Sequence, residues 1–127
     1  MSEKVVTNLR LTFPGGHRLA HGKAELMELI AETGSIRSAA ARMNMSYRRA
    51  WLLVDELNTM FQERSVETRH GGAKGGGAAL ADFGHALLAR FRAMEAASAQ
   101  AIADDLAWLS QRINPEAGPS GQDKAKG

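Results

Sequence analysis

Hydroxyl and guanidinium side chains stand together near the middle of the chain, in the combination that binds anionic groups. Ser46, Tyr47, Arg48 and Arg49 follow one another directly. A guanidinium can donate two parallel hydrogen bonds to a phosphate or to the edge of a guanine base. Residues 35–74 hold seven basic and four acidic residues, whereas residues 83–113 hold three of each. This excess favours a polyanionic partner such as nucleic acid, with an ordinary charged surface as the alternative.

The element that must position these side chains is a helix expected over residues 47–61. Ser46 is a residue type that caps the start of a helix. Apolar residues follow it with helical spacing and predict a buried stripe of Ala50, Leu53, Val54, Leu57 and Phe61. At about 100° per residue, Arg48 and Leu52 lie roughly 160° from Ala50 and therefore face outward, with Arg49 and Trp51 on the flanks.

Three other side chains on this helix have two interpretations each. Leu52 either touches a thymine methyl group or is a single exposed leucine, which is common on protein surfaces. The Tyr47 hydroxyl either contacts a phosphate or belongs to a ring that is half-buried in the core. For Trp51, packing at the boundary of the core is favoured over contact with nucleic acid.

A shorter helix and a tight turn come before residues 47–61. Ser35 can cap a helix over residues 36–43, whose run of alanines allows a neighbouring helix to approach closely at Ala40. Asn44 tolerates the left-handed backbone of a tight turn, and Met45 can fill the angle between the two helices. Two short helices joined in this way, the second of them basic, predict a helix-turn-helix, whose second helix enters the major groove of DNA.

A glycine-rich segment at residues 70–77, His-Gly-Gly-Ala-Lys-Gly-Gly-Gly, lies between two short expected strands at 65–69 and 78–80. A nucleotide-binding loop is excluded, because no Lys-Ser/Thr pair follows the last glycine. A flexible linker is one remaining interpretation. We favour the other, a β-hairpin wing whose glycines let the backbone approach a DNA strand while Arg69 and Lys74 supply positive charge.

Three further elements complete the expected fold. Residues 9–13 alternate as a half-buried strand does, and Pro14 ends the alternation. Residues 22–33 show helical spacing, and Gly34 provides a stop signal. A final helix over residues 83–112 would be about 45 Å long, more than one small domain covers. Its apolar stripe predicts a homodimer, with packing onto the chain's own domain as the alternative interpretation, and we expect both to occur. The stripe includes Ile113 and six residues expected to form the dimer contact: Leu87, Phe91, Met94, Ile102, Leu106 and Leu109.

Together these elements predict a mainly α fold, a winged helix-turn-helix with a small β wing and a long C-terminal dimerisation helix. The expected division is a flexible start at 1–8, the winged domain at 9–82, the dimerisation helix at 83–113 and a disordered polar tail at 114–127.

The chain has no cysteine, so disulfides and thiolate metal sites are excluded. No apolar run approaches the roughly 18 residues of a membrane span, and no secretory signal is recognisable. We therefore expect a soluble, cytoplasmic protein.

Metal binding and catalysis find little support in the sequence. His17 and His21 have a spacing that would suit a metal on one helix, but the Pro-Gly-Gly before them and Gly22 after them argue against a helix there. Neither a third ligand nor a nucleophile with a neighbouring base stands out. We expect no metal, no cofactor and no enzymatic activity.

Several motifs are similar to those of known DNA-binding regulators. Residues 35–46, Ser-Ile-Arg-Ser-Ala-Ala-Ala-Arg-Met-Asn-Met-Ser, resemble the helix-turn-helix of LysR-type regulators. The continuation Met-Ser-Tyr-Arg-Arg-Ala-Trp at 45–51, the glycine pattern at 71–77 and the spacing of Leu80 and Gly84 resemble more closely the N-terminal domain of the molybdate-responsive ModE regulators. The similarity runs from about residue 9 to about residue 109.

The resemblance implies a transcriptional regulator that binds a roughly palindromic operator as a homodimer. Double-stranded DNA and a second copy of the chain are the implied partners. The residues expected to contact DNA are Arg37, Ser46, Tyr47, Arg48, Arg49, Leu52, Arg69, Gly71, Gly72, Lys74, Gly75 and Gly76.

Two departures from that family are visible. Full-length members carry oxyanion-binding domains after this region, so we expect that this chain has no molybdate-binding domain and does not sense molybdate by itself. Ala81 replaces the usual threonine cap of the last helix, and we expect Asp82 to cap it instead.

The alternative function is a protein-interaction module that uses Trp51 and Leu52 on the helix expected over residues 47–61. Salt dependence separates the two functions, because only DNA binding should weaken steeply as salt rises.

Overall fold

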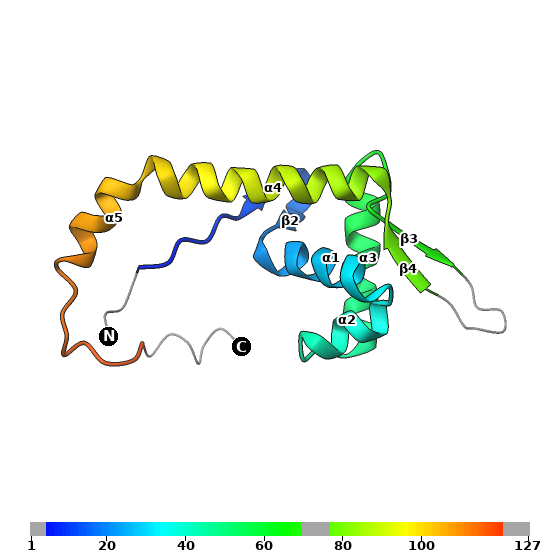
Figure 1. Cartoon of the computed structure of the whole chain (residues 1–127), viewed down its shortest axis with the longest axis horizontal. Helices are drawn as coiled ribbons and strands as arrows, with labels where there is room; N and C mark the ends of the chain where they lie inside the picture. The colour runs from blue at the N-terminus through cyan, green and yellow to red at the C-terminus, as the bar shows by residue number, and fades with distance from the viewer. Residues whose placement is uncertain (1–4, 70–76, 121–127) are drawn as a thin grey trace.

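Three short helices lie at the centre of the fold, and a long helix runs across them (Figure 1). The computed structural model describes residues 5–69 and 77–120. The central helices are α1 (His21–Thr33), α2 (Ile36–Arg42) and α3 (Tyr47–Met60). Their facing sides bury a shared apolar core that includes Leu26, Met27, Ile30, Ala39, Ala40, Ala50, Val54 and Leu57.

The end of α1 and the start of α2 are set by adjacent residues. Gly34 adopts a left-handed conformation with φ 72°, and its N–H donates to the Ile30 carbonyl at 2.8 Å. The Ser35 hydroxyl accepts a hydrogen bond from the N–H of Ser38 at 3.0 Å. Both the predicted stop and the predicted cap are confirmed.

The turn between α2 and α3 has the predicted chemistry. Asn44 has a φ of 57°, in the left-handed region that its short polar side chain tolerates. The Met45 N–H donates to the Ala40 carbonyl at 3.0 Å, and the Met45 side chain packs partly buried against the core. The Ser46 hydroxyl accepts from the N–H of Arg49 at 3.0 Å. These contacts fix the direction in which α3 leaves the turn.

The predicted wing hairpin is confirmed in its two strands. β3 (Val66–Arg69) pairs antiparallel with β4 (Gly77–Leu80), from Val66 opposite Leu80 to Arg69 opposite Gly77. Asn58 of α3 holds the start of β3 through hydrogen bonds with the Val66 carbonyl at 3.1 Å and with the Val66 N–H at 2.9 Å. The wing strands are therefore attached directly to α3.

The N-terminal strand differs from the prediction. β1 covers only Leu11–Thr12, and it pairs with a strand that the sequence analysis missed, β2 (Arg18–Leu19). A 3-10 turn at Pro14–Gly16 joins them. A strand of two residues is too short to show an alternating pattern, so the missed element left no periodic signal.

The predicted single C-terminal helix is wrong, because two helices occupy that region. α4 (Asp82–Ala101) and α5 (Ala103–Ser110) are separated at Ile102, where φ is −110° and ψ is 17°, and the bend is visible in Figure 1. Asp104 and Asp105 lie in the first turn of α5. Aspartate is disfavoured in a helix interior and stabilising near a helix N-terminus, which explains a new helix start here.

The start of α4 also corrects the prediction. Ala81 occupies the cap position without a side-chain hydrogen bond, and Asp82 is already the first helical residue. In place of a side-chain cap, the Ala81 N–H donates to the Ser65 carbonyl at 2.9 Å. One turn later, a Cβ on Gly84 would overlap the Ser65 carbonyl oxygen and lie 3.0 Å from its carbon. Gly84 therefore allows α4 to lie directly against the start of the wing.

The fold is mainly α with a small β wing, a winged helix-turn-helix, as predicted. Residues 114–120 contain no helix or strand, whereas the rest of the expected tail, 121–127, and residues 1–4 of the expected flexible start lie outside the described residues. None of the helices within 5–69 and 77–120 combines the length and apolar composition needed to cross a bilayer.

Candidate nucleic-acid interface

The outer face of α3 is exposed over its whole N-terminal half. Arg48 is exposed, and Leu52 is 58% exposed, whereas Ala50 and Val54 on the opposite side are fully buried. Among the described residues, Arg48 forms no ion pair with a carboxylate. This arrangement matches the outward direction predicted for both side chains, and it leaves a free guanidinium at the start of the helix.

Tyr47 and Trp51 lie at the edge of the same face. The Arg37 guanidinium stacks over the Tyr47 ring at 4.0 Å from the ring centre, which joins α2 to α3. Tyr47 and Trp51 meet edge to face with their ring centres 6.3 Å apart. They are 39% and 37% exposed, so neither is a core residue. Both rings and Arg37 are therefore accessible to a partner that approaches α3.

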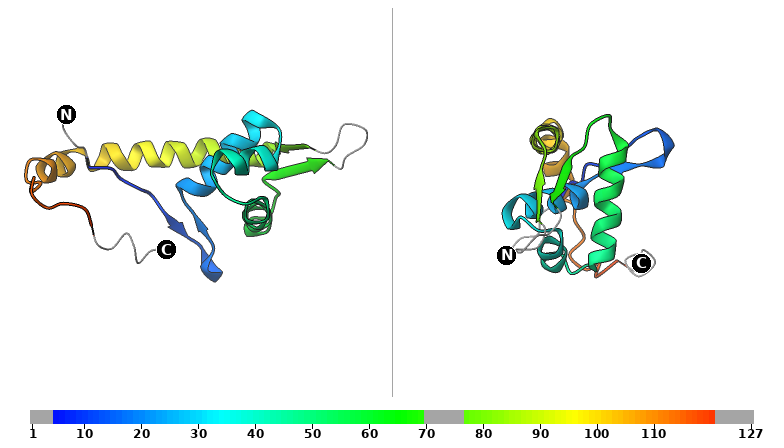
Figure 2. Two further views of the ribbon diagram at one scale, coloured as in Figure 1. Left: turned by 90° about the horizontal axis from the view of Figure 1, so that it is seen from below. Right: turned by 90° about the vertical axis from the view of Figure 1, so that its right-hand side faces the viewer.

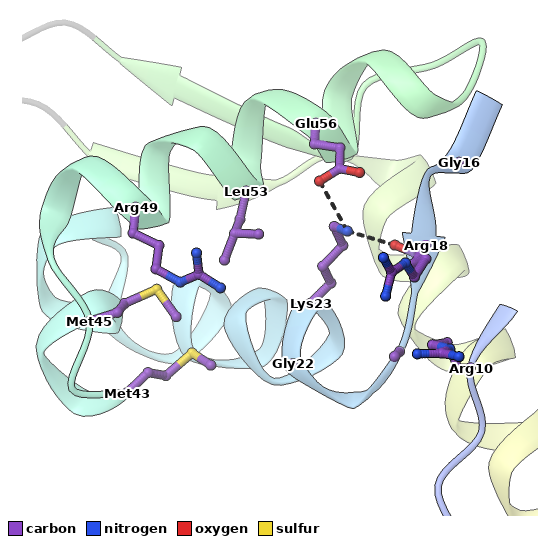
Figure 3. Close-up of a pocket in the computed structure, with 11 residues that line it drawn as sticks. Arg10, Gly16, Arg18, Gly22, Lys23, Met43, Met45, Arg49, Leu53 and Glu56 are labelled. Carbon is purple, nitrogen blue, oxygen red and sulfur yellow. Dashed lines mark hydrogen bonds and ion pairs between the residues drawn. The ribbon is translucent and has the colours of Figure 1, made fainter. Parts of the chain in front are cut away.

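Arg49 points along the flank of α3, as the helical geometry predicted. Its guanidinium lies in a pocket of about 410 Å³ together with Met43, Met45 and Leu53 (Figure 3). The pocket runs from the α2–α3 turn along α3 to the β1–β2 hairpin. Its lining also includes Arg10, Arg18, Lys23 and Glu56.

The one acidic side chain in this pocket is already paired. Glu56 accepts a hydrogen bond from His17 at 3.0 Å and forms an ion pair with the Lys23 ammonium at 3.1 Å. The hydrogen bond from His17, followed by the contact with Lys23, holds the pKa of the Glu56 carboxyl below its usual value. Because Glu56 is engaged by these two groups, it does not neutralise the arginines of the pocket.

The wing lies on one side of α3 and the β1–β2 hairpin on the other. Both views in Figure 2 place α3 between these two elements. Arg69 is exposed at the end of β3. The remaining predicted wing contacts, Gly71, Gly72, Lys74, Gly75 and Gly76, lie outside the described residues. The described strands thus present one basic side chain beside α3.

The predicted dimerisation stripe divides into two groups. Leu87 and Phe91 are 9% and 0% exposed and pack inside the chain's own core, so the alternative interpretation holds for them. Met94, Ile102 and Leu109 are 38%, 40% and 48% exposed, and Leu106 is half-buried. The apolar surface left for a partner therefore begins beyond Phe91.

Sequence reasoning missed the residues that act through distant contacts. Asn58 reads as an ordinary polar residue of α3, yet it holds the wing strand. Arg10 and Arg18 flank a turn whose second strand was not expected. For Arg10 a signal did exist, since it lies in the alternating stretch at residues 9–13, whereas Arg18 lies in a strand too short to show alternation.

The histidines do not form a metal site in the part of the chain that the structure describes. No group of three or more potential ligands comes together there. His17 precedes β2 and contacts Glu56, whereas His21 is the first residue of α1. The two rings therefore belong to different elements.

Comparison with known proteins finds relatives in bacteria. The chain is 35% identical over 100 residues to the molybdenum-pterin-binding protein MopA of Rhodobacter capsulatus, covering 79% of this chain and 38% of the relative. It is 36% identical over 103 residues to the molybdenum transport protein ModE of Azotobacter vinelandii, covering 81% of this chain and 37% of the relative. It is 36% identical over 66 residues to the DNA-binding transcriptional dual regulator ModE of Escherichia coli K12, covering 52% of this chain and 25% of the relative.

These matches concern only part of each relative. The chain spans less than two fifths of the length of these proteins, and the ModE regulators match in their N-terminal region. None of the three names describes an enzyme. No family model matches the chain.

Proposed function

We propose that this chain, whose homologues are the ModE-type molybdate-responsive regulators, binds double-stranded DNA and regulates transcription. The observation that carries the proposal is the exposed N-terminal half of α3. Arg48 and Leu52 are exposed there, on a helix that Ser46 caps and that lies between the wing and the β1–β2 hairpin (Figure 2). In helix-turn-helix proteins a helix held in this way lies in the major groove.

Each exposed residue has a defined role in this proposal. Arg48 donates to the edge of a guanine, and Leu52 packs against a thymine methyl group. Arg37 and Tyr47, already stacked on each other, contact the phosphates at the groove edge. Arg69 at the end of β3 contacts the backbone of the neighbouring strand. Base contacts thus come from α3 alone, and the other residues supply orientation and affinity.

The direct test measures binding to DNA as a function of salt. Sequences enriched by the protein from a random duplex library are labelled, and affinity is followed by fluorescence anisotropy from about 50 to 200 mM salt. Neutralising several phosphates makes affinity fall by orders of magnitude over this range. Failure to enrich any sequence, or an affinity independent of salt, would contradict the proposal.

The proposed regulator is a homodimer that reads a palindromic operator. α4 extends past the three central helices and is followed by α5 (Figure 1). Beyond Phe91, the exposed apolar residues are Met94 on α4, Ile102 at the bend and Leu109 on α5. A second copy related by a two-fold axis would cover this surface and present two copies of α3 to the duplex. An operator with two inverted half-sites follows from that symmetry. The proposed place of action is the cytoplasm, where a bacterial chromosome lies.

A second candidate function rests on the apolar character of the same face. Tyr47, Trp51 and Leu52 are all exposed on α3, and such a group of side chains also suits a protein partner. An interface of that kind is less sensitive to salt than one made through phosphates. A protein ligand bound through α3, with no enrichment of DNA, would favour this function over the first.

A further inference from the structure

The pocket between α3 and the β1–β2 hairpin carries positive charge that no interaction inside the described chain balances. Arg10, Arg18 and Arg49 line it, and none of the three forms an ion pair among the described residues. Lys23, in contrast, is occupied by Glu56 at 3.1 Å and by the Arg18 carbonyl at 2.6 Å. The pocket therefore has three unpaired guanidinium groups around a neutralised middle.

The register of the hairpin places two of these guanidiniums on one face. Leu11 pairs with Leu19 and Thr12 with Arg18, and side chains alternate along each strand. Leu19 is buried and Leu11 half-buried, so the leucines face inward. Arg10 and Arg18 therefore share the opposite, outer face as diagonal neighbours, an arrangement that a negatively charged ligand would stabilise.

The charges are spread along the pocket rather than aimed at one point. Figure 3 shows Arg49 at the end near the α2–α3 turn and Arg10 and Arg18 at the other end, with the Lys23–Glu56 pair between them. A site for one small anion needs donors that converge. An extended chain of phosphates matches this spacing better. The apolar side chains of Met43, Met45 and Leu53 line the stretch beside Arg49 and suit the apolar faces of sugars.

The pocket is also in the right place for such a chain. α3 lies between the wing and this hairpin in both views of Figure 2, and Arg49 belongs to the helix proposed to enter the groove. A duplex seated on α3 would present one strand edge to the wing and the other to the hairpin. Each edge would then meet basic side chains.

We propose that Arg10, Arg18 and Arg49 bind the phosphodiester backbone of the DNA strand on the side of α3 opposite the wing. This inference rests on the proposed function, since it needs the duplex on α3. The β1–β2 hairpin is then a second clamp, which contacts phosphates and carries no base specificity. The shared chemistry is a phosphate group, and the experiment below separates backbone phosphates from free phosphate.

The test uses the full chain with Arg10→Gln and Arg18→Gln combined, and Arg90→Gln as the matched control. Arg90 is an exposed arginine of α4 that does not line the pocket and forms no ion pair among the described residues. The variant that combines Arg10→Gln and Arg18→Gln, called the hairpin variant below, should bind the selected duplex more weakly than the wild type does. Its plot of log affinity against log salt should be shallower by about one unit for each phosphate that the variant no longer binds. Base preference should stay unchanged, and the control should match the wild type.

Ethylation interference identifies the phosphates involved. Ethylated phosphates on one flank of each half-site should block the wild type but no longer matter to the hairpin variant. A variant with the wild-type salt slope and interference pattern would overturn the proposal. Wild-type binding that is absent altogether would instead remove the proposed function, so the two failures are distinguishable.

A third arm uses inorganic phosphate and the arginine Nε–H signals of the protein in NMR spectra. Backbone binding predicts only weak, non-saturating shifts with phosphate alone. Saturable binding of phosphate that the hairpin variant loses, together with unchanged DNA binding, would show that the pocket serves a free anion and would overturn the proposal. Circular dichroism of each variant checks that these exposed substitutions leave the fold intact.

Discussion

Arg92 of α4 holds Glu28 of α1 through two parallel contacts. Its Nε donates to Oε2 and its Nη2 donates to Oε1, both at 2.9 Å. The remaining Nη1 donates to Glu95 on the next turn of α4 at 2.7 Å. This fork is the geometry that an arginine and a carboxylate form most favourably. It fixes α4 on α1 one residue beyond the buried Phe91, and so it sets the direction of the exposed part of α4.

The Arg92–Glu28 pair should make stability depend on pH in the acid range. The hydrogen bond from Arg92 lowers the pKa of Glu28 from its ordinary value of 4.5. A lowered folded-state pKa contributes stability above about pH 4.5, and this contribution is lost as pH falls through the folded value. Because Glu28 is 44% exposed, we expect Glu28→Gln to cost less than about 1 kcal/mol at pH 7.

Urea denaturation of wild type and Glu28→Gln at pH 7 and pH 3 measures this contribution. The difference in unfolding free energy should shrink at pH 3. Glu32→Gln is a suitable comparison, since Glu32 is 62% exposed and paired only with Arg42 at 3.3 Å in the described structure. An equal difference at both pH values would contradict the role given to the Arg92–Glu28 pair.

Replacing Arg48 with alanine should weaken DNA binding and relax sequence preference at one base position. The expected loss of binding free energy is on the order of 1–3 kcal/mol, because the variant lacks both hydrogen bonds that the guanidinium would donate to a guanine. Affinity for the selected duplex and for single-base variants, measured by fluorescence anisotropy, gives both quantities. Arg90→Ala should leave them unchanged. An equal loss on all sequences would mean that Arg48 contacts phosphate only.

Replacing Arg69 with alanine should lower affinity equally on every sequence. Arg69 ends β3, where the wing leaves the body of the domain, and a phosphate contact there carries no base information. The slope of log affinity against log salt should decrease by about one unit. A changed base preference with an unchanged slope would show that the wing reads bases.

Introducing charge into the exposed apolar part of α4 and α5 should dissociate the proposed dimer. We expect the double variant Met94→Glu and Leu109→Glu to be monomeric, because both side chains are exposed in one chain and would be buried between two. Analytical ultracentrifugation at micromolar concentration measures the mass. Ala93→Glu, which adds a charge at an exposed position facing away from Phe91, should remain dimeric. A wild type that sediments as a monomer would remove the dimer from the proposal.

Adding a single methyl group at Gly84 should destabilise the fold. The new Cβ would overlap the Ser65 carbonyl, so α4 or the start of the wing would have to move. We expect Gly84→Ala to lower the free energy of unfolding by about 1–3 kcal/mol. Gly22→Ala is the control, because Gly22 lies in α1 and a methyl group added to it would meet no atom within 4 Å. Gly22→Ala should raise the free energy of unfolding by about 0.4–1 kcal/mol, because alanine gives the unfolded chain fewer conformations than glycine does.

The parts of the fold that follow from local chemistry could be predicted from the sequence. Gly34, Ser35, Asn44 and Ser46 determine helix ends through hydrogen bonds and dihedral angles within a few residues, and each behaves as expected. The direction of Arg48 followed from helical periodicity. These features need no knowledge of the rest of the chain.

The parts that depend on distant partners could not be predicted. Arg92 and Glu28 are 64 residues apart, and nothing near either residue announces their contact. The bend at Ile102 has neither proline nor glycine to mark it, and only the paired aspartates that follow explain it. The basic pocket likewise depends on a hairpin whose second strand has only two residues.

The hydrogen bond from the Ala78 N–H to the Gly34 carbonyl, at 2.9 Å, ties the strand of the wing to the corner between α1 and α2. Asn58 ties the other strand to α3. With both strands anchored, α3, which we propose enters the groove, and the start of the wing are held in a fixed position relative to each other. Inserting one base pair between the bases contacted by α3 and the phosphates contacted by the wing should therefore abolish binding. Inserting one base pair at the centre of the operator leaves each half-site intact, so only the contact between the two copies of the chain would oppose it.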